Sequence, residues 1–141
     1  MIKIFVDTNI LVDFIADRKP FSKFALIIFE KAEKKEVSLY TSSHAIATTH
    51  YLLKKYISEK ELREVLYNIL DYLTIVAIDH DIIKKGLKSK HKDYEDALQI
   101  LAAHSIEKLD YIVTRNVKDF KECGIEVLAP EQILGKIRTT K

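Results

Sequence analysis

The fold is decided by the stretch IKIFVDTNI at residues 2–10. Residues 2–6 form a short β-branched and apolar run, which is typical of a buried strand. The run stops at three polar residues, Asp7, Thr8 and Asn9, whose side chains can begin a helix by accepting a hydrogen bond from a free backbone N–H. The chain is therefore predicted to open as strand, turn and helix.

The same alternation continues along the chain. Strands are expected at 37–41, 74–78, 111–114 and 126–128, and helices at 21–35, from 42 or 43 to about 56, 58–72, 79–88, 93–106 and 131–137, with a frayed tail after them. Parallel strands need a crossover to return the chain, and a helix usually supplies it. The pattern thus predicts an α/β fold with a parallel sheet covered on both faces.

Length and composition favour one ordinary globular domain over residues 1–141. The chain is 48% hydrophobic and 31% charged with only three glycines and two prolines, which argues against long disordered stretches. A single cysteine, Cys123, cannot form an internal disulfide, so a reducing compartment fits. We find neither a signal peptide nor a membrane span, and expect a soluble, cytoplasmic protein that makes no contact with membrane. The net charge of +2 gives no argument for nucleic acid.

Polar side chains gather where predicted strands end. Asp7 follows the first strand, Thr114 to Asn116 follow the fourth, and Asp93 and Asp96 lie on the helix between them. Ligands of open parallel sheets bind outside the carboxyl ends of the strands, so these groups converge if the first and fourth strands are neighbours. Clustered carboxylates repel one another unless a cation joins them. Oxygen ligands without histidine or thiolate suit Mg²⁺ or Mn²⁺, and phosphodiester chemistry commonly uses such a site.

Each group also has a plainer interpretation. Asp7 or Thr8 could only cap the first helix, and Asp93 with Asp96 could be a cap and a first-turn acid. The polar residues after the fourth strand could serve a turn. Against this, Asp96 lies beside an apolar stretch, an unfavourable place for an idle carboxylate. The five histidines are interpreted as structural or surface residues: His44, His50, His80, His91 and His104.

Three motifs at these positions resemble the PIN-domain family, in particular its VapC-like toxin ribonucleases. They are FVDTNILVD from Phe5, DYEDALQ from Asp93 and VTRNVKDF from Val113, and their order and spacing match over nearly the whole chain. The resemblance implies a three-layer α/β/α sandwich around a parallel sheet of about five strands in the order 3-2-1-4-5. It further implies cleavage of single-stranded RNA with Mg²⁺ or Mn²⁺, an antitoxin partner and a homodimer.

The resemblance also assigns roles. Asp7 becomes the first metal ligand and Asp96 the third acid, while Asn116 stands where the fourth acid is often found. Asp93 and Asp119 are nearby helpers. The hypothesis is hydrolysis by a metal-activated water, with Asp7 and Asp96 holding the ion and Asn116 completing its shell. Support is predicted from Thr8, Asn9, Thr48, Thr114 and Asp119, and phosphate contacts from Arg115 and Lys118.

One departure affects the second acid. The glutamate expected on the helix after the second strand falls on Thr48, and no acid occurs between Ser42 and Tyr56. A hydroxyl contributes less charge than the carboxylate it replaces, and Asp93 is the candidate to compensate. The alternative is therefore that the chain is a catalytically weak or inactive PIN-like protein with a nucleic-acid-binding or regulatory function. Phosphatases that form an aspartyl-phosphate place a second aspartate where this chain has Asn9, and phosphoacceptor domains need paired acids and a late lysine that are missing here.

Overall fold

Five parallel strands form the sheet in a computed structural model that describes residues 1–137. Its strands, in the order β3-β2-β1-β4-β5, are β1 (Ile2–Val6), β2 (Val37–Ser42), β3 (Leu73–Val76), β4 (Tyr111–Val113) and β5 (Glu126–Leu128). All four pairings are parallel, and β1 lies at the centre between β2 and β4. The predicted parallel sheet and its strand order are confirmed.

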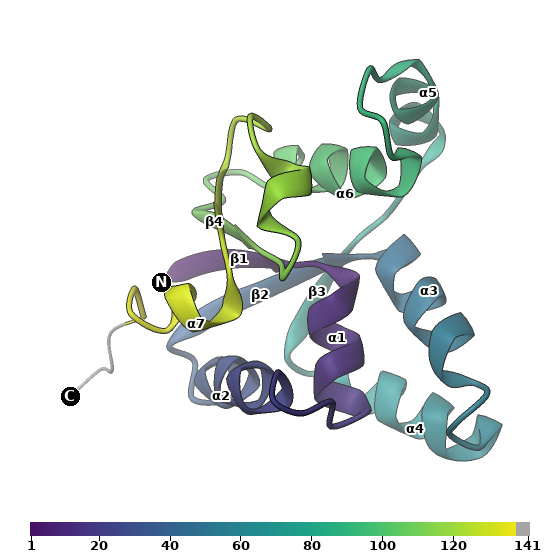
Figure 1. Ribbon diagram of the computed structural model, residues 1–141, viewed down its shortest axis with the longest axis vertical. Coiled ribbons are helices and arrows are strands. Elements are labelled where there is room, and N and C mark those ends of the chain that lie inside the picture. The colour runs from purple at the N-terminus through teal and green to yellow at the C-terminus, as the bar shows by residue number, and fades with distance from the viewer. Residues whose placement is uncertain (138–141) are drawn as a thin grey trace.

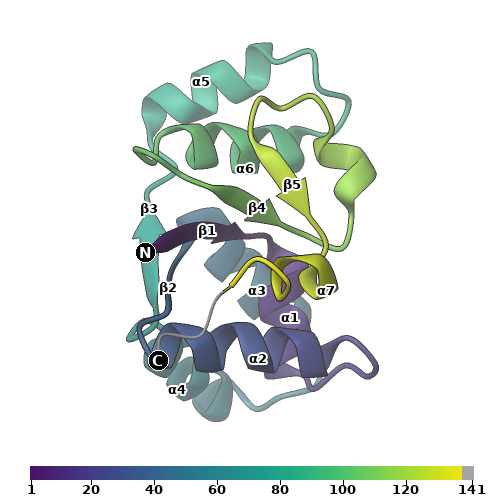
Figure 2. The same ribbon diagram turned by 90° about the vertical axis from the view of Figure 1, so that its left-hand side faces the viewer.

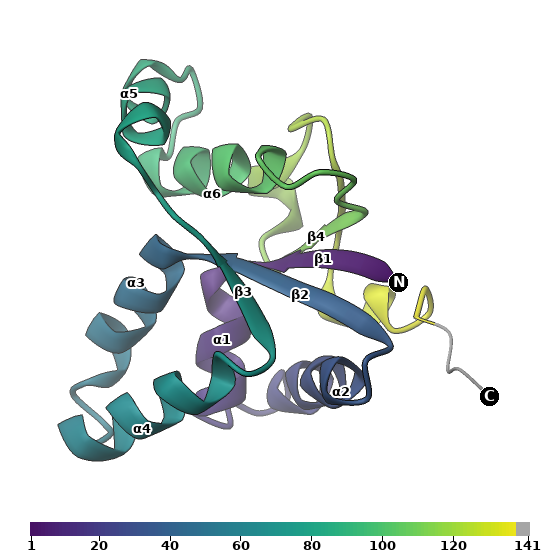
Figure 3. The ribbon, with the colours of Figure 1, turned by 180° about the vertical axis from the view of Figure 1, so that it is seen from behind.

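Helices cover both faces of this sheet. They are α1 (Thr8–Ile15), α2 (Ser22–Glu33), α3 (Ser43–Leu53), α4 (Glu59–Ile69), α5 (His80–Lys88), α6 (Tyr94–His104) and α7 (Pro130–Ile133). Figure 1 shows α5 and α6 on one face and α1 and α2 on the other, with α3 and α4 beside α1. The layers appear again from the side in Figure 2 and from behind in Figure 3. The three-layer arrangement is therefore confirmed. In the part of the chain described, no helix combines the length and apolar character needed to cross a bilayer.

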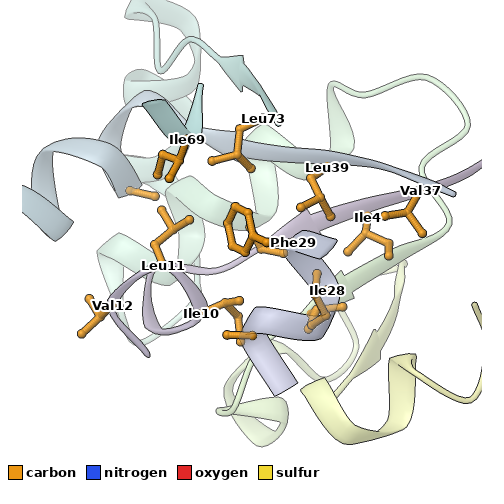
Figure 4. Close-up of a cluster of buried hydrophobic side chains, with 14 of the residues drawn as sticks. Ile4, Ile10, Leu11, Val12, Ile28, Phe29, Val37, Leu39, Ile69 and Leu73 are labelled. Atoms are coloured by element: carbon orange, nitrogen blue, oxygen red, sulfur yellow. The ribbon is translucent and has the colours of Figure 1, made fainter. Parts of the chain in front are cut away.

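The central strand β1 is apolar on both faces because both are buried. Ile4 and Val6 belong to the larger core cluster, on the side of α1 and α2, which Figure 4 shows in close-up. Phe5 points the opposite way and belongs to a second cluster with Ala102 and Ala103 of α6. Successive side chains of a strand alternate between its two faces, which explains this division. Burial on both sides fixes the register of β1 and with it the position of Asp7.

Side-chain caps start five of the helices. An aspartate or serine oxygen accepts a backbone N–H of the first turn in α1, α3, α4, α5 and α6, and the capping residues are Asp7, Ser42, Ser58, Asp79 and Asp93. These caps satisfy N–H groups that have no partner inside the helix. The predicted helix starts are thus confirmed to within one or two residues.

Several element ends differ from prediction. Helix α3 stops at Leu53 rather than near Tyr56, and α4 stops at Ile69 rather than near Tyr72. Strand β3 covers 73–76 instead of 74–78, and α7 covers 130–133 instead of 131–137. After α3 the chain makes tight turns, such as Tyr56 N–H to the Leu53 carbonyl, so apolar periodicity outlasts regular helical bonding. A 3₁₀ helix at 117–120 was not predicted, and the predicted frayed tail lies outside the described residues.

Candidate active site

A cavity of about 240 Å³ opens where strands β1 and β2 end and α1, α3 and α6 begin. Parallel strands place their carboxyl ends at one edge of the sheet, so side chains distant in sequence meet there. Six of the residues predicted from the sequence line this cavity: Asp7, Thr8, Asn9, Thr48, Asp96 and Asn116. The predicted convergence of the ends of the first and fourth strands is confirmed, because the Asp7 N–H donates to the Val113 carbonyl over 3.0 Å.

The Asp7 carboxylate is buried and held by several donors. Oδ1 accepts the Thr8 backbone N–H at 2.8 Å and the Gln99 side-chain amide at 3.1 Å. Oδ2 accepts the Thr114 hydroxyl at 2.8 Å and lies 3.5 Å from the Asn9 amide nitrogen. Asp7 is therefore the helix cap that the plainer interpretation expected, and it is also fixed in orientation at the wall of the cavity.

Gln99 links three elements beneath the cavity. It lies on α6 with 2% of its surface exposed, donates to Asp7, and accepts the Ser42 hydroxyl through Oε1. The Ser42 oxygen in turn accepts the Ala45 N–H at 2.9 Å as the cap of α3. No role for Gln99 was predicted from the sequence. Two features of the sequence could have indicated Gln99. It is a polar residue inside an apolar helix, and it follows Asp96 by three positions, which places both on the same face of that helix.

A second carboxylate in the cavity, that of Asp96, lies where its negative charge is disfavoured. Partial burial, followed by the negative charges of Asp93, Asp7 and Asp119, raises the pKa of Asp96 to about 6. A raised pKa means that the charged form is disfavoured where it stands. A cation in the cavity would remove that penalty, as would a proton.

This donor set fits a hard divalent ion in an open site. Across residues 1–137, no three histidine, cysteine, aspartate or glutamate side chains are grouped closely enough to enclose a metal. Magnesium commonly keeps several waters and is held by one or two carboxylates together with a substrate phosphate. Asp7, Asp96 and the amide of Asn116, all at the cavity, match that requirement.

Helix α3 also contributes side chains to the cavity lining. Thr48 lines the cavity at the position where the second acid was expected. The His44 ring nitrogen Nε2 lies 3.3 Å from the Thr48 hydroxyl and 3.2 Å from Glu95 Oε1 of α6. Neither His44 nor Glu95 was assigned to the site from the sequence. The signal was the spacing of His44, Thr48 and Leu52, which puts all three on one face of α3.

The other five predicted positions lie outside the cavity lining, and four of them are Asp93, Thr114, Lys118 and Asp119. Asp93 caps α6 by accepting the Asp96 N–H at 2.9 Å, so its plainer interpretation holds in the structure. Asp119 and Lys118 lie in the 3₁₀ helix, where Asp119 still contributes charge near Asp96. Thr114 does not line the cavity but reaches it through its bond to Asp7.

Arg115 has structural partners of its own. Its guanidinium donates two hydrogen bonds, of 2.6 and 3.1 Å, to the carboxylate of Asp13, which is 1% exposed. The guanidinium also lies 4.1 Å from the centre of the Phe21 ring. Arg115 therefore neutralises a buried acid behind the site. The phosphate contacts of Arg115 and Lys118 stay predictions.

Comparison with known proteins gives consistent matches. The family profile of the PIN domain matches residues 3–118. Ribonuclease VapC1 of Aquifex aeolicus (strain VF5) is 29% identical over 143 residues, which covers 97% of this chain and 96% of that protein. A toxin-antitoxin complex from Klebsiella pneumoniae contains a chain with 26% identity and a TM-score of 0.63, covering 90% of this chain and 97% of the other.

A further solved structure supports the fold alone. VapBC2 from Rickettsia felis, bound to a DNA fragment from its promoter, has a TM-score of 0.65 at 21% identity, and the match covers 91% of this chain and 98% of the other. The profile match extends over most of the chain and includes the Asp7, Asp96 and Asn116 positions. The chain belongs to the PIN-domain family.

Proposed function

We propose that this protein is an endoribonuclease that hydrolyses phosphodiester bonds of single-stranded RNA with Mg²⁺ or Mn²⁺. The observation that carries the proposal is the meeting of Asp7 and Asp96 in one cavity, where the raised pKa of Asp96 marks a site that favours a cation. The relationship to a protein named ribonuclease VapC1 supports the same activity.

The residues of the site have separate roles in this proposal. Asp7 and Asp96 would hold the ion, and Asn116 would complete its shell directly or through water. When bound, the cation supplies charge that lowers the pKa of an attacking water and stabilises the leaving oxygen. Gln99 and Thr114 keep the Asp7 carboxylate from turning away, because each donates to one of its oxygens. Asp96 must lose its proton to bind the ion, so activity is expected to rise as the pH passes 6.

The partner of such a nuclease would be an antitoxin, and the chain would act as the toxin of the pair. Support comes from the solved relatives, one of which is described as a toxin-antitoxin complex. Exposed aromatic side chains on and after α3 and on α4, among them Tyr56 at 82% and Tyr67 at 76%, suit a surface that another protein covers. A homodimer is proposed on the family resemblance alone, and sedimentation of the purified chain tests it.

A second candidate is a PIN protein that binds nucleic acid with little or no cleavage. It is favoured by Thr48, which leaves the cavity with one carboxylate fewer than the family pattern. Both candidates predict RNA binding, so only a cleavage assay separates them.

The test is incubation of an end-labelled single-stranded RNA with the purified protein in Mg²⁺, in Mn²⁺ and in chelator. Single-stranded DNA and duplex RNA of the same sequence serve as comparison substrates. The proposal expects cuts within the single-stranded RNA that chelator abolishes. Binding without metal-dependent cuts across several RNA sequences would favour the second candidate.

A further inference from the structure

The active-site cavity extends away from the acids along a groove between α1 and α3. Thr8 and Val12 line it from α1, one helical turn apart, and His44, Thr48 and Leu52 line it from α3 at the same spacing. The two helices run beside each other in Figures 1 and 3. Eight residues of helix advance by ~12 Å, so this groove is an extended channel rather than a pit for a single group. Its carboxylates lie at the end nearest the sheet.

Arg18 lines the same cavity from beyond the far end of α1. Its backbone is fixed on both sides, because its N–H donates to the Asp13 carbonyl over 3.1 Å and its carbonyl accepts the Ser22 N–H over 2.8 Å. The side chain is exposed to solvent. Within residues 1–137, no acidic side chain forms an ion pair with this guanidinium. A firmly placed backbone thus presents an unneutralised cation to the groove.

The two neighbouring cations are oriented differently. Arg115 is neutralised by the buried Asp13 and stacks on Phe21. Lys19 follows Arg18 directly but lines a separate cavity on the side of α2. Arg18 is therefore the arginine of this loop region that faces the groove with its charge available.

We infer that Arg18 binds a backbone phosphate of single-stranded RNA close to the scissile phosphate in the strand, so that the strand runs along the α1–α3 groove from the acids toward Arg18. The inference rests on the proposed function for the position of the scissile bond. Asp7, Glu95 and Asp96 lie at the other end of the groove and repel a polyanion. A guanidinium offers a phosphate two parallel hydrogen bonds as well as charge, which offsets part of that repulsion.

The binding test compares the removal of the positive charge at Arg18 with its removal at the adjacent Lys19. Arg18→Ala, Arg18→Lys and Lys19→Ala are each combined with Asp7→Asn, which prevents cleavage of the probe, and thermal melting confirms that each variant is folded. Fluorescence anisotropy with a fluorescein-labelled single-stranded RNA oligonucleotide gives the Kd. Arg18→Ala should raise the Kd about tenfold. It should also reduce the slope of log Kd against log salt concentration by the amount expected for about one phosphate contact, whereas Lys19→Ala should change the Kd less than about twofold. Arg18→Lys should lie between them, because lysine keeps the charge but loses the paired donors.

A modified substrate then locates the contact. Once the cleavage site of the wild type is mapped, a neutral methylphosphonate replaces, one at a time, the nearest phosphates on each side of it. One of these replacements should weaken binding when Arg18 is present and have little further effect after Arg18→Ala. Equal Kd values for Arg18→Ala and Lys19→Ala, or equal sensitivity of both proteins to the methylphosphonate, would overturn the inference. If the wild type shows no cleavage that depends on Asp7 but binding still depends on Arg18, the proposed activity fails and the groove contact stands.

Discussion

Gln99 of α6 donates a hydrogen bond of 3.1 Å to the Asp7 carboxylate, although the two residues are 92 positions apart in the sequence. The same amide accepts the hydroxyl of Ser42, the cap of α3. One buried side chain thereby couples the ends of β1 and β2 to the helix that carries Asp96. Gln99 is one of the donors that hold the Asp7 carboxylate, and replacing it should affect both stability and catalysis.

Gln99→Leu is expected to lower the free energy of unfolding by roughly 1–3 kcal/mol, because the buried Ser42 hydroxyl and one Asp7 oxygen lose a partner. It should also raise the Mg²⁺ concentration that gives half-maximal cleavage, since Asp7 is less firmly held. The matched control is Gln132→Leu, which removes an exposed contact to the Ala129 N–H. Denaturant unfolding and a metal titration of cleavage check both effects. An unchanged metal requirement in Gln99→Leu would exclude a positioning role.

The pair of Arg115 and Asp13 should matter for folding. Asp13 is 1% exposed, so Arg115→Met leaves a buried carboxylate without its partner and should destabilise the fold by about 3–5 kcal/mol. The control is Lys85→Met, which breaks an exposed pair with Asp81 and should change stability by less than about 1 kcal/mol. Urea unfolding of both variants measures the difference. Similar losses in the two would show that burial does not govern the Asp13 pair.

More of the fold than of the candidate site could be predicted from the sequence. Alternating strands and helices, together with caps such as Asp79 and Asp93, determine the parallel sheet and most helix starts, because these signals are local. Helix ends could not be predicted as well, since the periodicity of apolar residues continues through the tight turns after Leu53. The strand order came from the family resemblance, and the order in the structure agrees with it.

For the candidate site, the acids could be predicted from motifs at strand ends, but their side-chain partners could not, because these depend on tertiary packing. Gln99 and Arg18 belong to the cavity only because α6 and the loop after α1 border the same cavity as Asp7 in three dimensions. Conversely, Arg115 has the charge of a phosphate ligand, and its partner Asp13 lies 102 positions away. No local pattern distinguishes the two arginines. Thr48 lines the cavity, and its position was predicted by alignment with a motif helix, while its role in the site stays a prediction.

The raised pKa of Asp96 gives a prediction for stability without metal. Its pKa is about 6 in the folded chain, above the ordinary 3.8, so Asp96 destabilises the folded state progressively as the pH rises from about 4 to about 6. In chelator at pH 7, Asp96→Asn should therefore raise the free energy of unfolding by about 1 kcal/mol, a figure reduced because the side chain is partly exposed to screening solvent.

This gain should be nearly lost at pH 4, where Asp96 is protonated in the folded wild type and only about half ionised in the unfolded chain. Addition of Mg²⁺ should stabilise the wild type more than Asp96→Asn, since the ion binds the folded carboxylate. Thermal melts over this pH range, with and without metal, provide the measurement. A variant that is less stable than the wild type in chelator at pH 7 would contradict the assigned electrostatics.

Restoring the second acid should strengthen the site. Thr48→Glu adds a carboxylate to the cavity wall and is expected to lower the Mg²⁺ concentration for half-maximal cleavage about tenfold, or ~1.4 kcal/mol of binding free energy. The control is Ala47→Glu, which adds the same charge at the preceding, exposed position of α3 outside the cavity lining. Cleavage rates over a range of Mg²⁺ concentrations check this. Equal responses of the two variants would mean that general charge, not the place of Thr48, controls the metal.

The most direct measurement is the rate of single-stranded RNA cleavage by the wild type and by Asp7→Asn in saturating Mn²⁺, with circular dichroism to confirm that both are folded. Asp7→Asn changes one carboxylate oxygen to an amide and keeps the shape of the side chain. The metal-dependent mechanism predicts chelator-sensitive cleavage by the wild type and a loss of at least about a hundredfold in the variant. Equal rates for the two folded proteins would contradict the claim that Asp7 holds the catalytic ion.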